Sequence, residues 1–173
     1  MEPGTEHSFR PCRPEEAEAV FALVLGRMAW MDRQGIRQWN ACGYDRLYPL
    51  SYYQTQQERG TLYVLETAAG EIVSAGVLLE TDSRWRDDAP ALYLHNFVSH
   101  WEWPGSGRCF LEGAEALAAA REKRYLRLDS AEGNEALSAY YAARGFVPAG
   151  TCSEGGYRGV LRQKAVERGG PGL

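Results

Sequence analysis

The sequence contains little of what metal sites and disulfide frameworks are built from. It has three histidines and four cysteines in 173 residues. The cysteines stand far apart and form no Cys-x-x-Cys pair, and the spacing between His95 and His100 matches no common metal-binding motif. We therefore expect cysteines that stay reduced and a protein that needs no metal.

The chain also lacks a long hydrophobic run and an excess of positive charge. Its longest strongly apolar stretch, Val20–Leu25, is far too short to cross a bilayer, and the acidic start at 1–7 lacks the layout of a signal peptide. Nineteen Lys and Arg against 23 Asp and Glu leave a net charge of -4, which provides no cationic field for a nucleic-acid backbone. We expect a cytoplasmic protein without a membrane segment or a nucleic-acid partner.

What remains is the composition of an ordinary globular domain. Apolar residues make up 45% and charged residues 24% of the chain, close to average usage. A chain of this length normally forms one domain with a sizeable core. We expect a single ordered domain over 8–165, with flexible termini at 1–7 and 166–173.

Hydrophobic periodicity predicts a mixed α/β chain. Alternating or continuous apolar runs indicate strands, and apolar stripes with helical spacing indicate helices. The predicted strands are 8–12, 62–66, 72–80, 91–99, 125–130, 146–152 and 157–163, and the predicted helices are 14–33, 50–58, 106–123 and 134–144. The polar and aromatic segment 35–49 shows no clear period.

A glycine-rich loop joins the strand Ala91–Ser99 to the helix that follows. Its residues Gly105, Ser106, Gly107 and Arg108 are suited to direct backbone N–H groups outward at a helix N-terminus, where the helix dipole adds positive potential. This pattern predicts an anion site, although two glycines that simply form a tight turn give the same sequence. No Gly-Lys-Ser/Thr follows, so the loop is not a Walker loop.

A second pattern follows the strand Tyr125–Ser130. Asn134 and Tyr141 are seven residues apart, which is two helical turns, so the amide and the phenol lie on the same helix face. A phenol in that position can donate a proton to a leaving group. The alternative is that Tyr140 and Tyr141 are core residues of an amphipathic helix.

In this order and at this separation, the two patterns resemble the GNAT superfamily of N-acyltransferases. The loop motif of that family, Q/R-x-x-G-x-G/A, corresponds to Glu102–Gly107 here, and its later helix motif is matched by Asn134, Tyr141, Gly145 and Phe146. The resemblance covers roughly residues 8–163. It implies a GNAT-like single domain with a central mixed, mostly antiparallel sheet of about six to seven strands, flanked by about four helices.

The resemblance implies that the chain moves an acyl group from a phosphopantetheine thioester, such as acetyl-CoA, to the amine of a small molecule by direct attack. The pantetheine arm would pair with strand backbone, and the pyrophosphate would bind the glycine loop. The implied donor-binding residues are Phe97, Val98, Gly105, Ser106, Gly107, Arg108 and Asn134. Tyr141 would protonate the departing thiolate.

The attacking amine also needs a group that accepts its proton. Glu80 at its strand end and His95 on the central strand are the candidates; a solvated strand end and a hydrogen-bonded structural histidine are the alternatives. Where the first helices of the family form the acceptor wall, this chain has Trp30, Gln38 and Trp39. Their aromatic faces suit a flat or apolar acceptor, and ordinary core packing explains them equally well.

Glu102 departs from the family pattern, which has Gln or Arg at this position. A carboxylate beside the phosphates of CoA is repulsive by about 1 kcal/mol at partly exposed distances, and Arg108 is the one certain cation of the loop. The phosphopantetheine arm of an acyl carrier protein is therefore an alternative donor, and a catalytically inactive ligand-binding module is a further alternative. We expect exposed Trp85, Trp101 and Trp103 to line a homodimer or carrier-protein contact, because Trp is enriched at interfaces.

Overall fold

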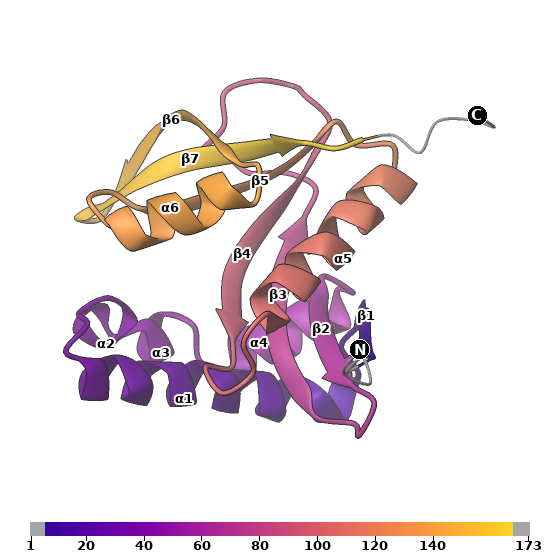
Figure 1. The fold of residues 1–173 in the computed structure, drawn as a ribbon, viewed down its shortest axis with the longest axis vertical. Coiled ribbons are helices and arrows are strands. Elements are labelled where there is room, and N and C mark those ends of the chain that lie inside the picture. The colour runs from indigo at the N-terminus through magenta and orange to yellow at the C-terminus, as the bar shows by residue number, and fades with distance from the viewer. Residues whose placement is uncertain (1–5, 168–173) are drawn as a thin grey trace. The chain divides into compact units, whose positions relative to one another are not determined.

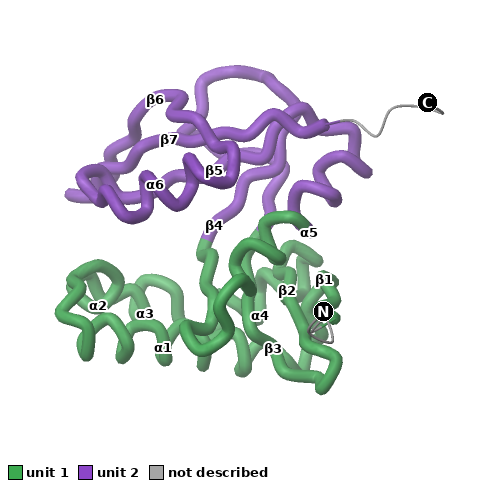
Figure 2. The backbone as a smooth tube through the Cα atoms, in the orientation of Figure 1, with its two compact units in different colours: residues 1–77, 96–112 green, residues 78–95, 113–173 purple. Residues whose placement is uncertain are grey.

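The chain forms two compact units, which Figure 2 shows in different colours. The computed structural model describes residues 6–167. Unit 1 comprises Met1–Val77 and Asn96–Glu112, and unit 2 comprises Leu78–His95 and Gly113–Leu173. The chain passes from one unit to the other inside two strands and one helix, so the units share continuous secondary structure.

The structure contains every strand and helix that the periodicity predicts (Figure 1). The elements are β1 (His7–Pro11), the 3-10 helix η1 (Pro14–Glu16), α1 (Ala17–Gln34), α2 (Trp39–Cys42), α3 (Tyr44–Leu47), α4 (Leu50–Glu58), β2 (Leu62–Thr67), β3 (Ile72–Leu79), β4 (Ala91–Ser99), α5 (Ser106–Ala120), β5 (Tyr125–Ala131), α6 (Glu135–Ala143), β6 (Val147–Glu154) and β7 (Tyr157–Ala165). The described residues thus hold six α-helices where about four are expected. The two additional helices, α2 and α3, have four residues each, too few for an apolar stripe to repeat.

The strands form one sheet in the order β1-β2-β3-β4-β5-β7-β6. β4 pairs with β5 in parallel, and the pairs β1–β2, β2–β3, β5–β7 and β6–β7 are antiparallel. The prediction of a mixed, mostly antiparallel sheet is therefore confirmed.

The helix α1 forms where several sequence signals agree. Pro14 opens the 3-10 helix η1 directly before it, at a position where the missing N–H costs nothing. Gly35 ends the helix in the left-handed conformation, with φ 69°, which glycine adopts without strain. Val20 and Val24, in its apolar stripe, are fully buried, and α1 packs against α4.

The core of unit 1 is centred on β2 and β3. Both strands are buried along nearly their whole length, which indicates that both faces of this part of the sheet are covered. Phe9 stacks on Tyr63 with ring centroids 5.2 Å apart, and it meets Phe110 of α5 edge-on at 5.2 Å. Phe110 also stacks on Phe97 of β4. These rings fix the start of α5, where the glycine loop lies.

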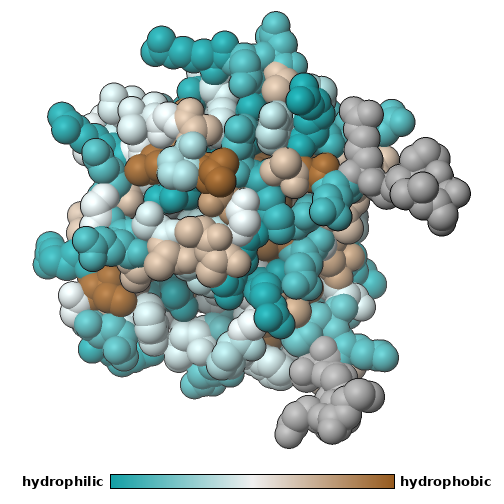
Figure 3. Space-filling model, turned by 45° about the horizontal axis from the view of Figure 1, so that its top comes forward, coloured by the Kyte–Doolittle hydropathy of each residue, from teal (hydrophilic) through white to brown (hydrophobic). Residues whose placement is uncertain are grey.

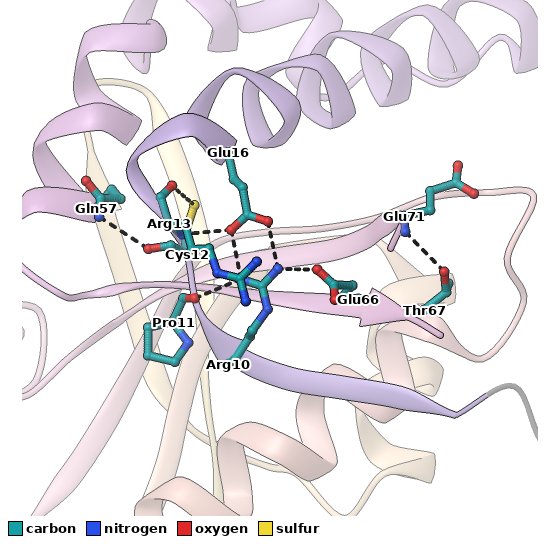
Figure 4. Close-up of polar contacts among 9 residues, drawn as sticks. All are labelled: Arg10, Pro11, Cys12, Arg13, Glu16, Gln57, Glu66, Thr67 and Glu71. Atoms are coloured by element: carbon teal, nitrogen blue, oxygen red, sulfur yellow. Dashed lines mark hydrogen bonds and ion pairs between the residues drawn. The ribbon is translucent and has the colours of Figure 1, made fainter. Parts of the chain in front are cut away.

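A network of charges ties β1 to its neighbours (Figure 4). Arg10 donates to both carboxylate oxygens of Glu16 at 2.7 Å, and it also donates to Glu66 on β2. The side chain of Arg10 is only 17% exposed. The hydrogen bond to Glu16 outweighs the cost of desolvation, so the pKa of Arg10 lies above its ordinary value. The guanidinium thereby links β1, η1 and β2.

Unit 2 is built on β5, β7 and β6, and α6 packs against β5. The side chain of Asn134 accepts a hydrogen bond from the N–H of Leu137 at 3.0 Å, which confirms the predicted cap of α6. β6 is exposed along most of its length, and its pairing with β7 is irregular at Pro148. Proline at an exposed edge discourages pairing with another chain.

The surface carries few large hydrophobic side chains. Figure 3 shows hydrophobic residues as small separate patches on a mainly hydrophilic face. Among residues 6–167, the large hydrophobic residues that are exposed are Leu25, Leu47, Val147 and Tyr157. Scattered residues of this kind are normal for a folded protein. Among the described residues, no helix has the length and apolarity needed to cross a membrane.

The ordered chain extends slightly beyond the predicted limits of 8–165. His7 pairs with Thr67 in β1, and the N–H of Val166 donates to the carbonyl of Arg124 at 2.8 Å. The remaining parts of the predicted flexible termini, 1–5 and 168–173, lie outside the described residues.

The strand β4 contains a left-handed residue, Asn96, with φ 54°, a conformation that non-glycine residues rarely adopt. Before it, the carbonyl of Pro90 accepts from the N–H of Arg124, on the β5 side. After it, the carbonyl of Val98 accepts from the hydroxyl of Ser74, on the β3 side. The backbone groups of even-numbered residues therefore face β5 before Asn96 and β3 after it. A β-bulge changes the direction of backbone groups in the same way.

Candidate active site

The glycine loop opens α5 as the sequence predicts. At the start of the helix, the N–H of Ser106 already bonds a loop carbonyl, and the N–H of Cys109 bonds the carbonyl of Gly105. Gly105 has φ 87°, so only glycine fits this turn without strain. Over the described part of the chain, the N–H groups of Gly107 and Arg108 are then the ones left for a ligand at this helix N-terminus.

A buried hydroxyl supports a binding role for this helix start. Ser106 is 2% exposed, and its Oγ has no hydrogen-bond partner among the described residues. A buried hydroxyl without a partner costs about 1–3 kcal/mol. A phosphate oxygen of a ligand at the N-terminus of α5 would remove that cost. The residues present here therefore fit a phosphate-bearing cofactor.

The charged side chains near this loop are solvated. Arg108 lies 3.8 Å from Glu112, and the two side chains are 60% and 67% exposed, so this pair contributes little. Glu102 is exposed, and its backbone N–H donates to Nδ1 of His100 at 3.1 Å. Because water and salt screen an exposed carboxylate, Glu102 repels a bound phosphate less than its position in the sequence implies.

The backbone of β4 refines the predicted donor contacts. Val98 faces β3, because its carbonyl accepts from Ser74 and the N–H of His100, two residues on, donates to a carbonyl of β3. Strand alternation turns the N–H and C=O groups of Phe97 and Ser99 the opposite way. The backbone groups of Phe97 thus point away from β3, as pairing with a pantetheine arm requires. The carbonyl of Val98 is already bonded to Ser74 on β3. Sequence reasoning missed Ser99, because the left-handed residue before it shifts the alternation.

The ladder between β4 and β5 is short. It covers three residue pairs and ends at Tyr93 and Arg127, although β4 continues to Ser99 and β5 to Ala131. Beyond Tyr93, the backbone groups of β4 that point away from β3 take no part in this ladder. They are the groups with which an extended, amide-bearing ligand can pair.

The predicted acceptor residues belong to the helices of unit 1. Trp39 stacks on Tyr44 with ring centroids 4.2 Å apart and planes 4° from parallel. Gln38 precedes it as the first cap of α2. Trp30 lies on α1 against the guanidinium of Arg27, 4.2 Å from the ring centroid. All three predicted residues are half-buried, and the rings of Trp30 and Trp39 already make contacts within unit 1.

One side chain links these helices to β4. Asn96 donates through Nδ2 to the hydroxyl of Tyr44 and accepts at Oδ1 from the hydroxyl of Tyr52, both at 2.7 Å. Burial raises the pKa of Tyr44 and raises that of Tyr52 to about 12, so both phenols remain neutral. Sequence reasoning missed this cluster, because nothing in the spacing of the three residues relates them.

The phenol of Tyr141 is buried within unit 2. Tyr141 is 7% exposed, and its ring meets Tyr140 and Phe146 edge-on at 5.3 and 5.7 Å. Burial raises the pKa of Tyr141, the nearby Tyr140 and Asp129 raise it further, and Arg162 opposes them. A phenol is protonated at neutral pH even at its ordinary pKa, which a proton donor requires, and the raised pKa extends this state to alkaline pH.

Glu80, one of the two predicted proton acceptors, follows directly after β3 and is exposed. Its Oε1 lies 2.9 Å from Nζ of Lys123. This hydrogen bond lowers the pKa of Glu80, and a lower pKa makes the carboxylate a weaker base. The structure therefore places Glu80 in a solvated ion pair.

His95, the other predicted acceptor, is half-buried on β4. Its Nε2 lies 3.1 Å from Oδ2 of Asp82, whose side chain is 8% exposed. Burial alone would raise the pKa of Asp82, but the hydrogen bonds from His95 and from the N–H of Arg84 outweigh it, and the pKa is lowered. An ionised carboxylate therefore stands beside the imidazole. Sequence reasoning named His95 but missed Asp82, because no spacing rule relates a loop residue to the next strand.

The three tryptophans that we expect to be exposed are half-buried. Trp85 lies over the guanidinium of Arg127 at 4.2 Å, and Trp101 stacks on His100 at 4.4 Å. Trp103 meets the imidazole of His7 edge-on at 6.4 Å. The prediction of exposure is wrong, because contacts within the chain occupy these rings. The expectation of a homodimer or carrier-protein contact through these tryptophans depended on their exposure and is therefore not supported by it.

Comparisons with known proteins found relatives of similar length and fold. No family model matches the sequence. The uncharacterized N-acetyltransferase YesJ of Bacillus subtilis is 26% identical over an alignment of 145 residues, and the match covers 79% of this chain and 79% of that protein.

Two solved structures share nearly the whole fold. An acetyltransferase of the GNAT family from Listeria monocytogenes has a TM-score of 0.76 and 26% identity, and the match covers 95% of this chain and 98% of that one. The PaiA N-acetyltransferase of Thermoplasma acidophilum, solved in complex with coenzyme A, has a TM-score of 0.69 and 15% identity over 92% of this chain and 99% of that one. The second likeness, at this identity, shows the fold alone.

Proposed function

Because the chain belongs to the GNAT superfamily, we propose that it is an N-acyltransferase that moves an acetyl group from acetyl-CoA to the amine of a small molecule. The observation that carries the proposal is the start of α5, where the glycine loop and the unpaired, buried hydroxyl of Ser106 suit a phosphate group. Acetyl-CoA, when bound, supplies the thioester and the pyrophosphate.

Unit 1 provides the groups that would hold the donor. The N–H groups of Gly107 and Arg108 and the hydroxyl of Ser106 would bind the pyrophosphate. The backbone groups of Phe97 and Ser99 that point away from β3 would pair with the amides of the pantetheine arm, as one strand pairs with another. Most of these contacts come from the main chain, so they depend little on which side chains the loop carries.

Unit 2 provides the groups that would move protons. The nitrogen of the acceptor bonds to the acetyl carbon while the carbon–sulfur bond breaks, the sulfur takes the proton that Tyr141 holds, and the phenolate is then reprotonated from solvent. The phenol of Tyr141 is protonated at neutral pH, as a donor must be, and its raised pKa makes it a weak acid that gives up the proton only to the basic thiolate. Asn134 contributes indirectly, because it caps the helix that carries Tyr141.

The amine loses its proton to His95 rather than to Glu80. An exposed carboxylate held by Lys123 is a weak base, whereas a neutral imidazole is a base suited to neutral pH. The half-buried position of His95 beside Asp82 also fixes the ring. The acceptor would lie against Trp30, Gln38 and Trp39, whose aromatic faces suit a flat or apolar amine.

An acyl carrier protein is the second candidate donor. Glu102 favours it, because this exposed carboxylate stands where the family has Gln or Arg, and a carrier arm brings one phosphate instead of a pyrophosphate.

The first test is thermal unfolding of the whole chain with coenzyme A, acetyl-CoA and acetyl-pantetheine, which lacks phosphates. A ligand at 100 times its Kd stabilises the folded state by about 2.7 kcal/mol, so we expect a clear rise in Tm with the first two and a smaller one with the third. Release of free thiol in the presence of polyamines, aromatic amines and amino acids then measures transfer.

The outcomes separate the alternatives. No rise in Tm with either coenzyme form, together with transfer from an acyl carrier protein, would replace acetyl-CoA by the carrier. A rise in Tm without thiol release from any donor would make the chain a ligand-binding module and overturn the proposal.

A further inference from the structure

The loop between β3 and β4 is anchored by charged side chains of unit 2. Arg84 donates through Nη1 to Oδ1 of Asp129 on β5 and through Nη2 to Oε2 of Glu154 on β6, both at 2.9 Å. The second oxygen of Asp129 accepts from the hydroxyl of Tyr157 on β7 at 2.7 Å. Three strands therefore hold the first half of the loop.

A buried arginine holds the second half of the same loop. Arg127 on β5 is 2% exposed and donates to both carboxylate oxygens of Asp87 at 2.7 and 2.9 Å. Its guanidinium also lies 4.2 Å from the ring centroid of Trp85. Bidentate pairs of this kind fix geometry as well as adding energy. The loop is thus fastened at two points, through Arg84 and through Arg127.

Asp82 lies on this fastened loop and faces His95. Its Oδ1 accepts the N–H of Arg84 at 2.9 Å, which orients the carboxylate, and its Oδ2 lies 3.1 Å from Nε2 of His95. Among the described residues, the other charged and titratable groups of this cluster are Arg84 on the loop, Asp129 on β5, Cys152 and Glu154 on β6, and Tyr157 on β7. Asp129 is paired with Arg84. The carboxylate that contacts the imidazole of His95 is that of Asp82.

We propose that Asp82 is a positioning residue, which holds His95 in the orientation and tautomer in which Nδ1 accepts the proton of the attacking amine. This inference rests on the proposed function. The carboxylate keeps a hydrogen on Nε2, so the lone pair of the neutral ring is on Nδ1. The proton passes from the amine nitrogen to Nδ1, the resulting imidazolium is stabilised by Asp82, and the proton then leaves to solvent.

The tautomer of His95 can be measured directly. Long-range proton–nitrogen NMR correlations distinguish the two ring nitrogens, and the chain has only three histidines, so His7 and His100 serve as internal references. We expect the Nε2–H tautomer at neutral pH in the unmodified protein. Asp82→Asn keeps an oxygen for the N–H of Arg84 but offers an amide to the ring, so we expect the Nε2–H tautomer to be lost.

Kinetics provide the second reading. Asp82→Asn should lower kcat by about 10- to 100-fold, part of the contribution of a general base, and should move the acid limb of the kcat/KM profile. Asp88→Asn on the same exposed loop is the matched control and should change neither tautomer nor rate. In the His95→Gln background, Asp82→Asn should have no further effect on kcat, because its effect passes through the imidazole.

Failure of this inference and failure of the proposed function give different results. An unchanged His95 tautomer in Asp82→Asn, or a rate loss that persists in the His95→Gln background, overturns the role of Asp82 while acetyl transfer stands. Absence of transfer to every amine in the unmodified protein overturns the function, and with it the role of Asp82 in a reaction, whatever the tautomer is.

Discussion

The two units of the chain place polar groups of different kinds. In unit 1, the groups suited to a ligand are neutral: backbone N–H groups, the hydroxyl of Ser106, and two phenols joined by Asn96. In unit 2, the corresponding groups are a buried phenol and an imidazole beside a carboxylate: Tyr141, His95 and the ionised Asp82. Main-chain N–H groups and a hydroxyl suit a phosphate, whereas an imidazole beside a carboxylate suits the acceptance of a proton. Under the proposed function, groups of unit 1 would bind the donor and groups of unit 2 would transfer protons.

The two units also differ in how they hold these groups. Unit 1 uses ring contacts and uncharged hydrogen bonds, such as the stack of Trp39 on Tyr44, while the loop of unit 2 is held by ion pairs of Arg84 and Arg127. Ion pairs with one exposed member weaken with salt. Changes in unit 1 should therefore affect affinity and stability, and changes in unit 2 should affect the rate and its pH dependence.

The largest effect is expected for Tyr141→Phe, which tests whether unit 2 supplies the proton. If Tyr141 is the proton donor, its removal should lower kcat by about 1,000-fold and leave the Kd of acetyl-CoA unchanged, because the proposed donor contacts lie in unit 1. Its raised pKa keeps Tyr141 protonated above pH 10, so its ionisation should cause no alkaline loss of activity below that pH. Tyr140→Phe is the matched control and should stay near the unmodified rate. A weaker Kd at unchanged kcat would contradict the assignment.

The second prediction concerns Asn96 in unit 1. Asn96→Ala loses both hydrogen bonds to the phenols and keeps the left-handed backbone, so unfolding free energy should fall by about 3 kcal/mol. Asn96→Gly loses the same hydrogen bonds but adopts φ 54° without strain, so it should lie about 1 kcal/mol above the alanine variant. Urea unfolding measures both. Equal stability of the two variants would show that the backbone at this residue carries no strain.

The local features of the fold could be predicted from the sequence. β4 and α4 have the predicted bounds, and the cap at Asn134 is present, because short runs of the chain determine apolar periodicity and capping. The same holds for the glycine loop before α5. α2 and α3 could not be predicted, since four residues are stabilised by tertiary contacts such as the stack of Trp39 on Tyr44 rather than by their own period.

The features of the candidate site that depend on distant residues were beyond sequence reasoning. Asp82 meets His95 only because an ion-paired loop folds back on β4, and Asn96 reaches Tyr44 across 52 positions of the chain. The backbone of Ser99 points away from β3 because Asn96 has a left-handed conformation. Asparagine tolerates this conformation, but its presence in a sequence does not predict it. Ring contacts bury Trp85 in the same way, although its charged neighbours suggest exposure.

Ser106→Ala tests the binding role of unit 1 with a smaller effect. The hydroxyl has no partner in the described structure, so its removal should leave the unfolding free energy of the free protein unchanged or slightly higher. The Kd of acetyl-CoA should rise about 10-fold, the loss of one hydrogen bond to a charged group. Calorimetric titration and thermal unfolding measure the two effects. A clear loss of stability without ligand would mean that the hydroxyl serves the fold.

The smallest expected effect belongs to Glu80→Gln, and its smallness is informative. Glu80 and His95 are both predicted proton acceptors of unit 2, but the carboxylate of Glu80 is 57% exposed and held by Lys123 at 2.9 Å. An exposed pair contributes at most about 1 kcal/mol, so stability should barely change and kcat should fall by less than about 3-fold. His95→Gln is the matched comparison and should lose about 100-fold. If Glu80→Gln lost more activity than His95→Gln, Glu80 would be the base. The contact between Asp82 and His95 would then have no role in catalysis.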